Sequence, residues 1–253
     1  EKEQSRQSPQ AIELPCRVSG RFLERNDVDW FRFQAKKAQM VHVEAFGERL
    51  GQLMDLEVTI HDADKLVTTV GDLVAPKDAP PTLPLASLDP SMDWKVPADG
   101  EYRIAVRDLY GGSVFGANRV YQLIVAVAQP GFFAITMPDS SKPSRGVFVK
   151  RGETCEISVI VMRTGSFSEP VTVRETTAIR GLTIEPCIVD GKEMTKKIRL
   201  SAGQDTAIGF QSLRLVAEAQ IGSDKQVVPV WNAVQIRPGA TRRIEQLIVY
   251  VSE

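Results

Sequence analysis

The sequence lacks the features that mark membrane spans, disulfide scaffolds and proteins that collect polyanions. No run of 18 or more apolar residues occurs in its 253 residues, so we predict no membrane span. Three cysteines are too few, and odd in number, for a disulfide framework. Lys+Arg 31 against Asp+Glu 32 gives a net charge of -1. This balance creates no overall basic field, so we predict no nucleic-acid partner.

The short motifs of common catalytic sites are also missing. None of G-x-S-x-G, H-E-x-x-H, G-x-x-x-x-G-K-[ST] or C-x-x-C occurs. The two histidines, His42 and His61, have no cysteine or second histidine at the spacing of metal ligands. We interpret both as solvent-facing polar residues, and we predict that the chain is not an enzyme.

The N-terminal stretch EKEQSRQSPQ gives no information on localisation. It has neither an initiator methionine nor the apolar segment of a signal peptide. We interpret the chain as a piece of a larger polypeptide, whose activity can lie outside these residues.

Period-two alternation of apolar and polar residues runs through the whole sequence, and helical periodicity is nearly absent. In WFRFQA this alternation places Phe31 and Phe33 on one face. In MVHVEA it turns Val41 and Val43 inward, with His42 outward. Short strands separated by Gly, Pro, Asp and Ser clusters predict an all-β protein built from antiparallel sandwiches.

The length and one break in the pattern predict two domains. A chain of 253 residues is long for one core and comfortable for two of about 125 residues each. Gln129, Pro130 and Gly131 interrupt two long apolar runs, so the predicted domains are 1–128 and 129–253. We expect two tandem antiparallel β-sandwiches, the first jelly-roll-like and the second immunoglobulin-like.

Two segments of the first domain are candidate ligand-binding loops. Residues 71–92 hold five prolines without alternation, and long loops inside compact domains are usually functional or poorly ordered. Residues 108–118, DLYGGSVFGAN, read as a glycine-rich hairpin tip. Its Tyr110 and Phe115, together with Trp94, would form a sugar- or peptide-binding platform if all three were exposed together.

The cysteine pairing is open. Cys155 shares its parity with buried positions of its strand, whereas Cys187 points the other way unless Pro186 makes a bulge. A Cys155–Cys187 disulfide is one alternative. Buried free thiols are the interpretation we favour.

Residues 9–128 resemble the bacterial pre-peptidase C-terminal domain, a β-sandwich appended to secreted bacterial proteins, peptidases among them. The resemblance rests on Gly20 and Phe22, then on NDVDWFRFQAKKAQMVHVEA, MDLEVTIHDADKLV, VPADGEYRIAVRD and YQLIV in the order of the family. Ala38 stands where the family usually has glycine, and Lys65 replaces a turn glycine. Residues 129–253 look like an immunoglobulin-like sandwich of the kind found beside such domains, on strand rhythm more than on motif.

The resemblance implies a non-catalytic accessory module of a secreted, periplasmic or cell-surface protein, with a polysaccharide, an extracellular protein or other domains of the same polypeptide as partners. Collagen-binding members bind calcium near the edge that corresponds to Asp27 and Asp29. A Ca²⁺-dependent polymer-binding domain is therefore one alternative, and a hydrolase with an unfamiliar site is another. From the residues alone, we favour a structural role in which Asp27 caps the turn after Asn26 and Asp29 bonds a neighbouring backbone amide.

Overall fold

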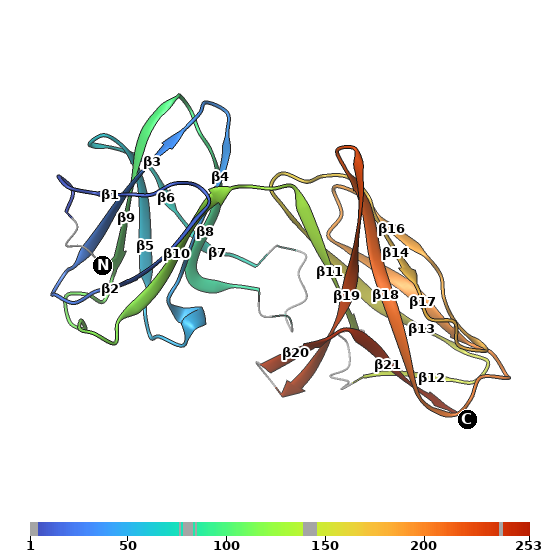
Figure 1. Cartoon of the computed structure of the whole chain (residues 1–253). Helices are drawn as coiled ribbons and strands as arrows, with labels where there is room; N and C mark the ends of the chain where they lie inside the picture. The colour runs from blue at the N-terminus through green and yellow to red at the C-terminus, as the bar shows by residue number, and fades with distance from the viewer. Residues whose placement is uncertain (1–4, 76, 78–82, 84, 139–145, 238–239) are drawn as a thin grey trace. The chain divides into compact units, whose positions relative to one another are not determined.

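The computed structural model describes residues 5–75, 77, 83, 85–138, 146–237 and 240–253. The regular secondary structure of this described part is β-strand, apart from one short 3-10 helix, η1 (Glu48–Leu50). The chain divides into two compact units, Glu1–Ala75 with Leu85–Ala128, and Pro76–Pro84 with Gln129–Glu253 (Figure 1). No helix in the described residues is both long and apolar enough to cross a membrane.

The first unit contains two five-stranded sheets. One sheet has the order β1 (Gln10–Ala11), β3 (Val28–Ala35), β9 (Gly100–Asp108), β5 (Leu56–Asp62) and β6 (Lys65–Val70). The other has the order β2 (Cys16–Arg21), β10 (Val120–Val127), β4 (Met40–Phe46), β8 (Ser87–Lys95) and β7 (Asp72–Leu73). The pairs in both sheets are antiparallel except for β1 with β3.

Alternate side chains of both sheets form one core, as the alternation predicts. Phe31, Val41, Val58, Ile104 and Leu123 come from five different strands and are all completely buried. The predicted antiparallel sandwich of the first half is therefore confirmed, because every second side chain of each strand packs against the facing sheet.

Two expectations about loops of the first unit are wrong. Residues 108–118 do not form a hairpin tip, because β9 and β10 belong to different sheets and the segment connects them. The predicted loop over 71–92 contains β7 and the first part of β8. Pro90 is tolerated in β8 because the pairing with β7 is irregular there, so its missing N–H interrupts no regular ladder. Residues 76, 78–82 and 84 of this segment lie outside the described residues.

The second unit is also built from strands, several of them long. Its main path has the order β12 (Val147–Lys150), β21 (Gln246–Ser252), β18 (Gly209–Ile221), β19 (Asp224–Arg237), β11 (Gly131–Pro138), β13 (Thr154–Thr164), β17 (Thr195–Ala202) and β15 (Leu182–Ile184). Beside this path, β14 (Val171–Glu175) pairs with β16 (Cys187–Val189) and β18, and β20 (Ala240–Ile244) pairs with β19.

Strand β18 changes partners along its length, and this change folds the sheet over its own core. Residues 209–214 pair with β21, whereas 215–221 pair with β14 and β19. The enclosed core includes Val159, Leu200, Leu213 and Val249, which are completely buried. Long strands that serve two sheets close the corners of a sandwich.

The cysteines are free thiols. Cys16, Cys155 and Cys187 form no disulfide, and each is partly buried. Cys155 and Cys187 both pack against the second core, and burial raises the pKa of the Cys155 thiol to about 11. Cys187 points inward because Pro186 separates β15 from β16 and resets the alternation.

Candidate functional site

Asp27 and Asp29, the predicted calcium ligands, direct their carboxylates to different partners. Asp27 precedes β3, and its Oδ2 accepts hydrogen bonds from the backbone N–H of Leu23 at 2.9 Å and of Glu24 at 3.5 Å. Asp29 lies within β3, is 5% exposed, and accepts a hydrogen bond of 2.6 Å from the Tyr121 hydroxyl. The first acid closes a turn and the second belongs to the core. These partners differ, and Ca²⁺ binding by the two acids stays a prediction.

The motif residue Gly20 belongs to the same cluster as Asp29. A Cβ on Gly20 would lie 2.5 Å from ring atoms of Tyr121, which is closer than van der Waals contact allows. The Tyr121 ring stacks on Phe22, with 4.8 Å between the ring centroids. These residues of the family pattern therefore position one buried tyrosine and its hydrogen bond to Asp29.

The three predicted platform aromatics do not lie on one surface. Trp94 is 7% exposed and packs edge-on against Tyr102 in the core. Its position in β8 faces inward, and this placement excludes it from an exposed platform. Tyr110 and Phe115 are each 48% exposed. Ligand binding by these two residues stays a prediction.

A buried ion pair holds the segment that carries Tyr110 and Phe115. Asp108 pairs with Arg119, both almost fully buried, and also accepts a hydrogen bond of 3.1 Å from the Tyr110 N–H. Arg119 donates to the Leu53 carbonyl at 2.7 Å. The acid and the arginine thus tie the connection between the sheets to the loop before β5.

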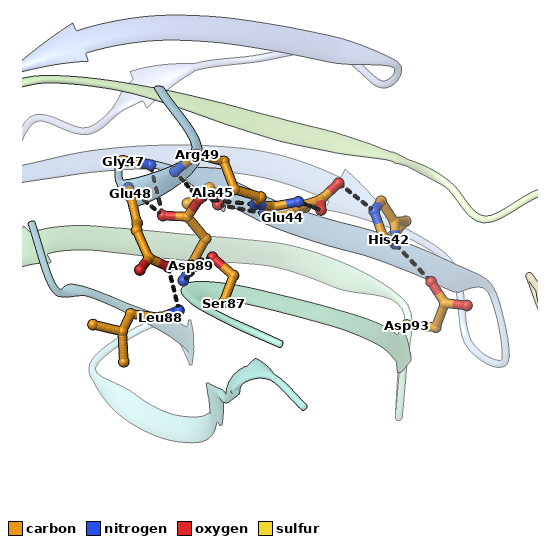
Figure 2. A network of polar contacts seen from close by, with 10 residues as sticks. All are labelled: His42, Glu44, Ala45, Gly47, Glu48, Arg49, Ser87, Leu88, Asp89 and Asp93. Atoms are coloured by element: carbon orange, nitrogen blue, oxygen red, sulfur yellow. Dashed lines mark hydrogen bonds and ion pairs between the residues drawn. The ribbon is translucent and has the colours of Figure 1, made fainter. Parts of the chain in front are cut away.

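A network of charged side chains covers the outer face of β4 and β8 (Figure 2). His42 lies opposite Asp93 in the register of these strands, and its Nδ1 is 2.7 Å from Asp93 Oδ1. Its Nε2 is 3.3 Å from Glu44 Oε2. Glu44 in turn accepts a hydrogen bond of 2.7 Å from Arg49 Nη1. Four charged groups are therefore connected in sequence across two strands and η1.

Asp89 is the buried end of this network. Its Oδ1 accepts hydrogen bonds from the N–H groups of Gly47 and Glu48 at 2.7 and 2.8 Å. Its Oδ2 accepts from the Arg49 N–H and Arg49 Nε at 2.9 and 2.8 Å. One carboxylate from β8 thus satisfies the N–H groups that open the turn at η1, as a capping residue does.

Glu48 of η1 also forms hydrogen bonds with the start of β8. Its Oε2 accepts hydrogen bonds from the Ser87 hydroxyl at 2.7 Å and from the Leu88 N–H at 2.8 Å (Figure 2). The turn after β4 and the start of β8 are therefore fastened in both directions. This fastening is the physical role of the acids at this site.

The network shifts the pKa values of its members. The hydrogen bond with Glu44 raises the pKa of His42 above its ordinary value of 6.5, and Asp93 adds to the rise while burial opposes it. Burial acts to raise the pKa of Glu44, but hydrogen bonds with His42 and Arg49 outweigh it and lower the pKa. The pKa of Asp89 is also lowered, because hydrogen bonds from Arg49 and the η1 backbone exceed the effect of burial.

This arrangement suits a structural role better than acid–base catalysis. Both ring nitrogens of His42 face carboxylates, so the ring is stabilised as a cation and offers no basic nitrogen to a substrate. Among the residues that the structure describes, no three His, Cys, Asp or Glu side chains are grouped to hold a metal ion. The outward direction of His42 and Glu44 was predictable from alternation. Their partners on β8 and η1 were not, because they are distant in sequence.

The other histidine also has a local partner. His61 Nε2 lies 2.9 Å from the Thr59 hydroxyl, and the ring packs against Trp30 with 5.1 Å between centroids. Burial, together with the charge of Arg6, lowers the pKa of His61. The pKa of His42 therefore lies above the ordinary histidine value, and the pKa of His61 lies below it.

An open pocket of about 950 Å³ lies at one end of the first unit. Ile12, Leu14 and Val127 contribute apolar surface, and Glu13 and Lys36 contribute charges of both signs. The Asp99 carboxylate at its border accepts a hydrogen bond of 2.6 Å from the Lys37 N–H. Mixed charge around an apolar floor indicates no particular class of ligand.

No protein-family model matches the chain, and no curated protein matches it. Among solved structures, it is similar to the pre-peptidase C-terminal domain of a collagenase from Bacillus anthracis, with 12% identity, a TM-score of 0.34, and coverage of 49% of this chain and 98% of that one. A β-glucuronidase from Bifidobacterium dentium matches at 11% identity and a TM-score of 0.37, over 87% of this chain and 42% of that one. A β-glycosidase from Bacteroides vulgatus matches at 11% identity and a TM-score of 0.32, over 81% and 26%. The chain thus spans less than half of these two glycosidases, and TM-scores this low assign it to none of these families.

Proposed function

We propose that the chain is a non-catalytic module of a larger secreted or cell-surface bacterial protein, where it contacts a polysaccharide or an extracellular protein. The motif resemblance of residues 9–128 to the pre-peptidase C-terminal domain supports this proposal. The strand rhythm of residues 129–253, which is typical of immunoglobulin-like sandwiches, supports it as well.

The observation that carries the proposal is the use of the buried aspartates of the first unit. Asp29, Asp89 and Asp108 are each 5% exposed or less, and each accepts hydrogen bonds from its own chain. A catalytic carboxylate must reach substrate and have a pKa suited to proton transfer. These three carboxylates instead hold a tyrosine, a turn and a connection between sheets, as expected of a scaffold.

The experiment has an activity arm and a binding arm. Purified chain is incubated with peptide, glycoside and polysaccharide substrates, and we expect no product above a buffer control. Binding is then screened on glycan and collagen arrays, where we expect retention by a defined polymer. Product formation that a His42→Ala or Asp93→Asn variant abolishes would contradict the non-catalytic role, and silence on every array would contradict the binding role.

Calcium dependence is a separate part of the proposal, and it rests on the family resemblance alone. Melting temperature is therefore compared in Ca²⁺ and in EDTA for the wild type and for Asp27→Asn. Calcium binding at Asp27 predicts a fall in EDTA that the variant does not show, whereas identical curves remove calcium from the proposed function.

A further inference from the structure

Three aromatic side chains form a row on the outer face of the second unit. Tyr250 on β21 lies opposite Phe148 on β12 and opposite Phe210 on β18 in the registers of these strands. The ring centroids are 5.9 Å apart between Phe148 and Tyr250, and 5.0 Å apart between Phe210 and Tyr250. Since β12, β21 and β18 are neighbours in the sheet (Figure 1), the row crosses them at right angles to the strands.

The alternation of these strands forces the rings outward. Val147 and Val149 on either side of Phe148 are buried, as are Val249 and Val251 around Tyr250. Phe148 is 61% exposed and Phe210 is 76% exposed. The row therefore consists of large apolar side chains that the core does not use, in a chain with only 7% aromatic residues.

The row is narrow, and both polar and apolar residues border it. Along the strands, Lys150 and Ser252 lie on one side of it, opposite each other, and Ser212 with Ile248 lies on the other. Even if fully covered by a ligand, three aromatic side chains bury a surface area of about 450–750 Å². A stable protein interface needs roughly 800 Å² from each partner. A thin ligand with hydrogen-bonding groups on both sides fits this surface better than a folded protein.

The charges around the row favour an acidic ligand. The segments that form this face are VFVK, the first six residues of β18 (GFQSLR) and QLIVYVS. They contain Lys150 and Arg214 and no acidic residue. Lys150 is exposed and lies two residues from Phe148 on the same face of β12. An anionic group beside the row would meet a cation and no fixed negative charge on these strands.

We propose that this aromatic row binds a single chain of an acidic polysaccharide, with pyranose faces against the exposed rings of Phe148 and Phe210 and a carboxylate beside Lys150. The C–H groups on the face of a pyranose ring pack on the electron-rich face of an aromatic ring. Neighbouring rings are inclined to each other by 54° and 66°, so the row suits one twisting chain and not a flat crystalline surface. The inference rests on the binding role proposed above and names its ligand class and site.

The test is affinity electrophoresis in EDTA, in gels that contain polygalacturonate, alginate or neutral xyloglucan. We expect the two acidic polysaccharides to retard the wild type. Phe148→Ala and Phe210→Ala should each bind roughly tenfold more weakly, and the double variant more weakly still, because each substitution removes a ring on which a sugar packs. Lys150→Gln should weaken binding and reduce its dependence on salt. Ile188→Ala, which removes an exposed apolar side chain from β16 of the same unit, should leave it unchanged.

Several outcomes would overturn the inference. These are an absence of retardation, equal retardation of the wild type and the double variant, or equal retardation by xyloglucan. Sedimentation of the wild type as a dimer and of the double variant as a monomer would make the row an interface between copies instead. Circular dichroism verifies that each variant is folded. Release of reducing ends by the chain would contradict the non-catalytic role without affecting the row, so the two proposals fail separately.

Discussion

At the scale of single residues, the first unit depends on a glycine that makes room for a buried tyrosine. The Tyr121 ring occupies the space where a Cβ of Gly20 would stand, and its hydroxyl reaches the buried Asp29. A side chain at residue 20 would therefore displace the ring from Phe22 and lengthen the hydrogen bond to a carboxylate that is removed from water.

We predict that Gly20→Ala lowers the free energy of unfolding by about 1–3 kcal/mol, the usual cost of overpacking a core. Urea denaturation followed by tryptophan fluorescence measures the change. Gly100→Ala is the matched control, since Gly100 also lies in a strand and a Cβ there would meet nothing within 4 Å. Equal stability of the two variants would show that the Tyr121 ring moves without cost.

The reverse substitution is informative at Ala38. Ala38 has a φ of 67°, in the left-handed region that favours glycine, and it stands where the resembling family usually has glycine. The conformation costs a non-glycine residue about 1–2 kcal/mol. Part of this cost is offset because alanine restricts the unfolded chain more than glycine does.

Ala38→Gly is therefore expected to raise the free energy of unfolding by about 0.5–1 kcal/mol, measured by urea denaturation. Ala117, exposed in a turn without positive φ, is the control. Ala117→Gly should be neutral or destabilising, because glycine there adds only freedom to the unfolded chain. A loss of stability in both variants would contradict strain at Ala38.

At the scale of elements, the network on β4, η1 and β8 couples the stability of the first unit to pH through His42. Its pKa is raised in the folded protein, so protonation favours the folded state. The stabilisation is fully present below the unfolded value near 6.5 and is lost as pH rises through the folded pKa. His61 has the opposite sign, because its lowered pKa makes protonation favour the unfolded state.

We expect the difference in free energy of unfolding between the wild type and His42→Gln to be largest at pH 6 and to shrink by pH 8. Denaturation curves at several pH values measure it. His61→Gln should give a difference of the opposite pH slope, which serves as the internal control. A pH-independent difference at His42 would mean that Asp93 and Glu44 do not favour its protonated form.

At the scale of the whole molecule, two separate cores hold the chain. One cluster of buried side chains runs from Ile12 to Val125 in sequence, and the other from Phe132 to Val251. Among the residues that the structure describes, none belongs to both clusters. Each unit therefore buries its own apolar faces, which is the property of an independently folding domain.

Residues 1–128 and 129–253, produced separately, are accordingly predicted to unfold cooperatively, each with a β-type circular dichroism spectrum. Urea titration of each piece and of the full chain is the measurement. Non-cooperative unfolding of residues 1–128 would show that this half needs residues 129–253 to complete its core.

The local alternation of apolar and polar residues predicted much of the architecture. Alternation alone identified the all-β class and the inward residues Phe31, Phe33, Val41 and Val43, because a strand places every second side chain on the same face whatever its partners are. Gln129 and Pro130 likewise lie directly before β11, which begins at Gly131. The same alternation directs Phe148 and Tyr250 away from the core, because the valines on either side of each ring are buried.

Only the tertiary structure determined which residues of different strands are neighbours. Residues 148, 210 and 250 become neighbours only through the pairing of β12, β21 and β18, and Asp89 reaches η1 only because β8 pairs with β4. The same pairing took Trp94 into the core and placed 108–118 between two sheets. Strand periodicity is a local property of the chain, so it can be predicted from the sequence. The register and the partners of each strand depend on the free energy of the whole core, so they cannot be predicted from local sequence.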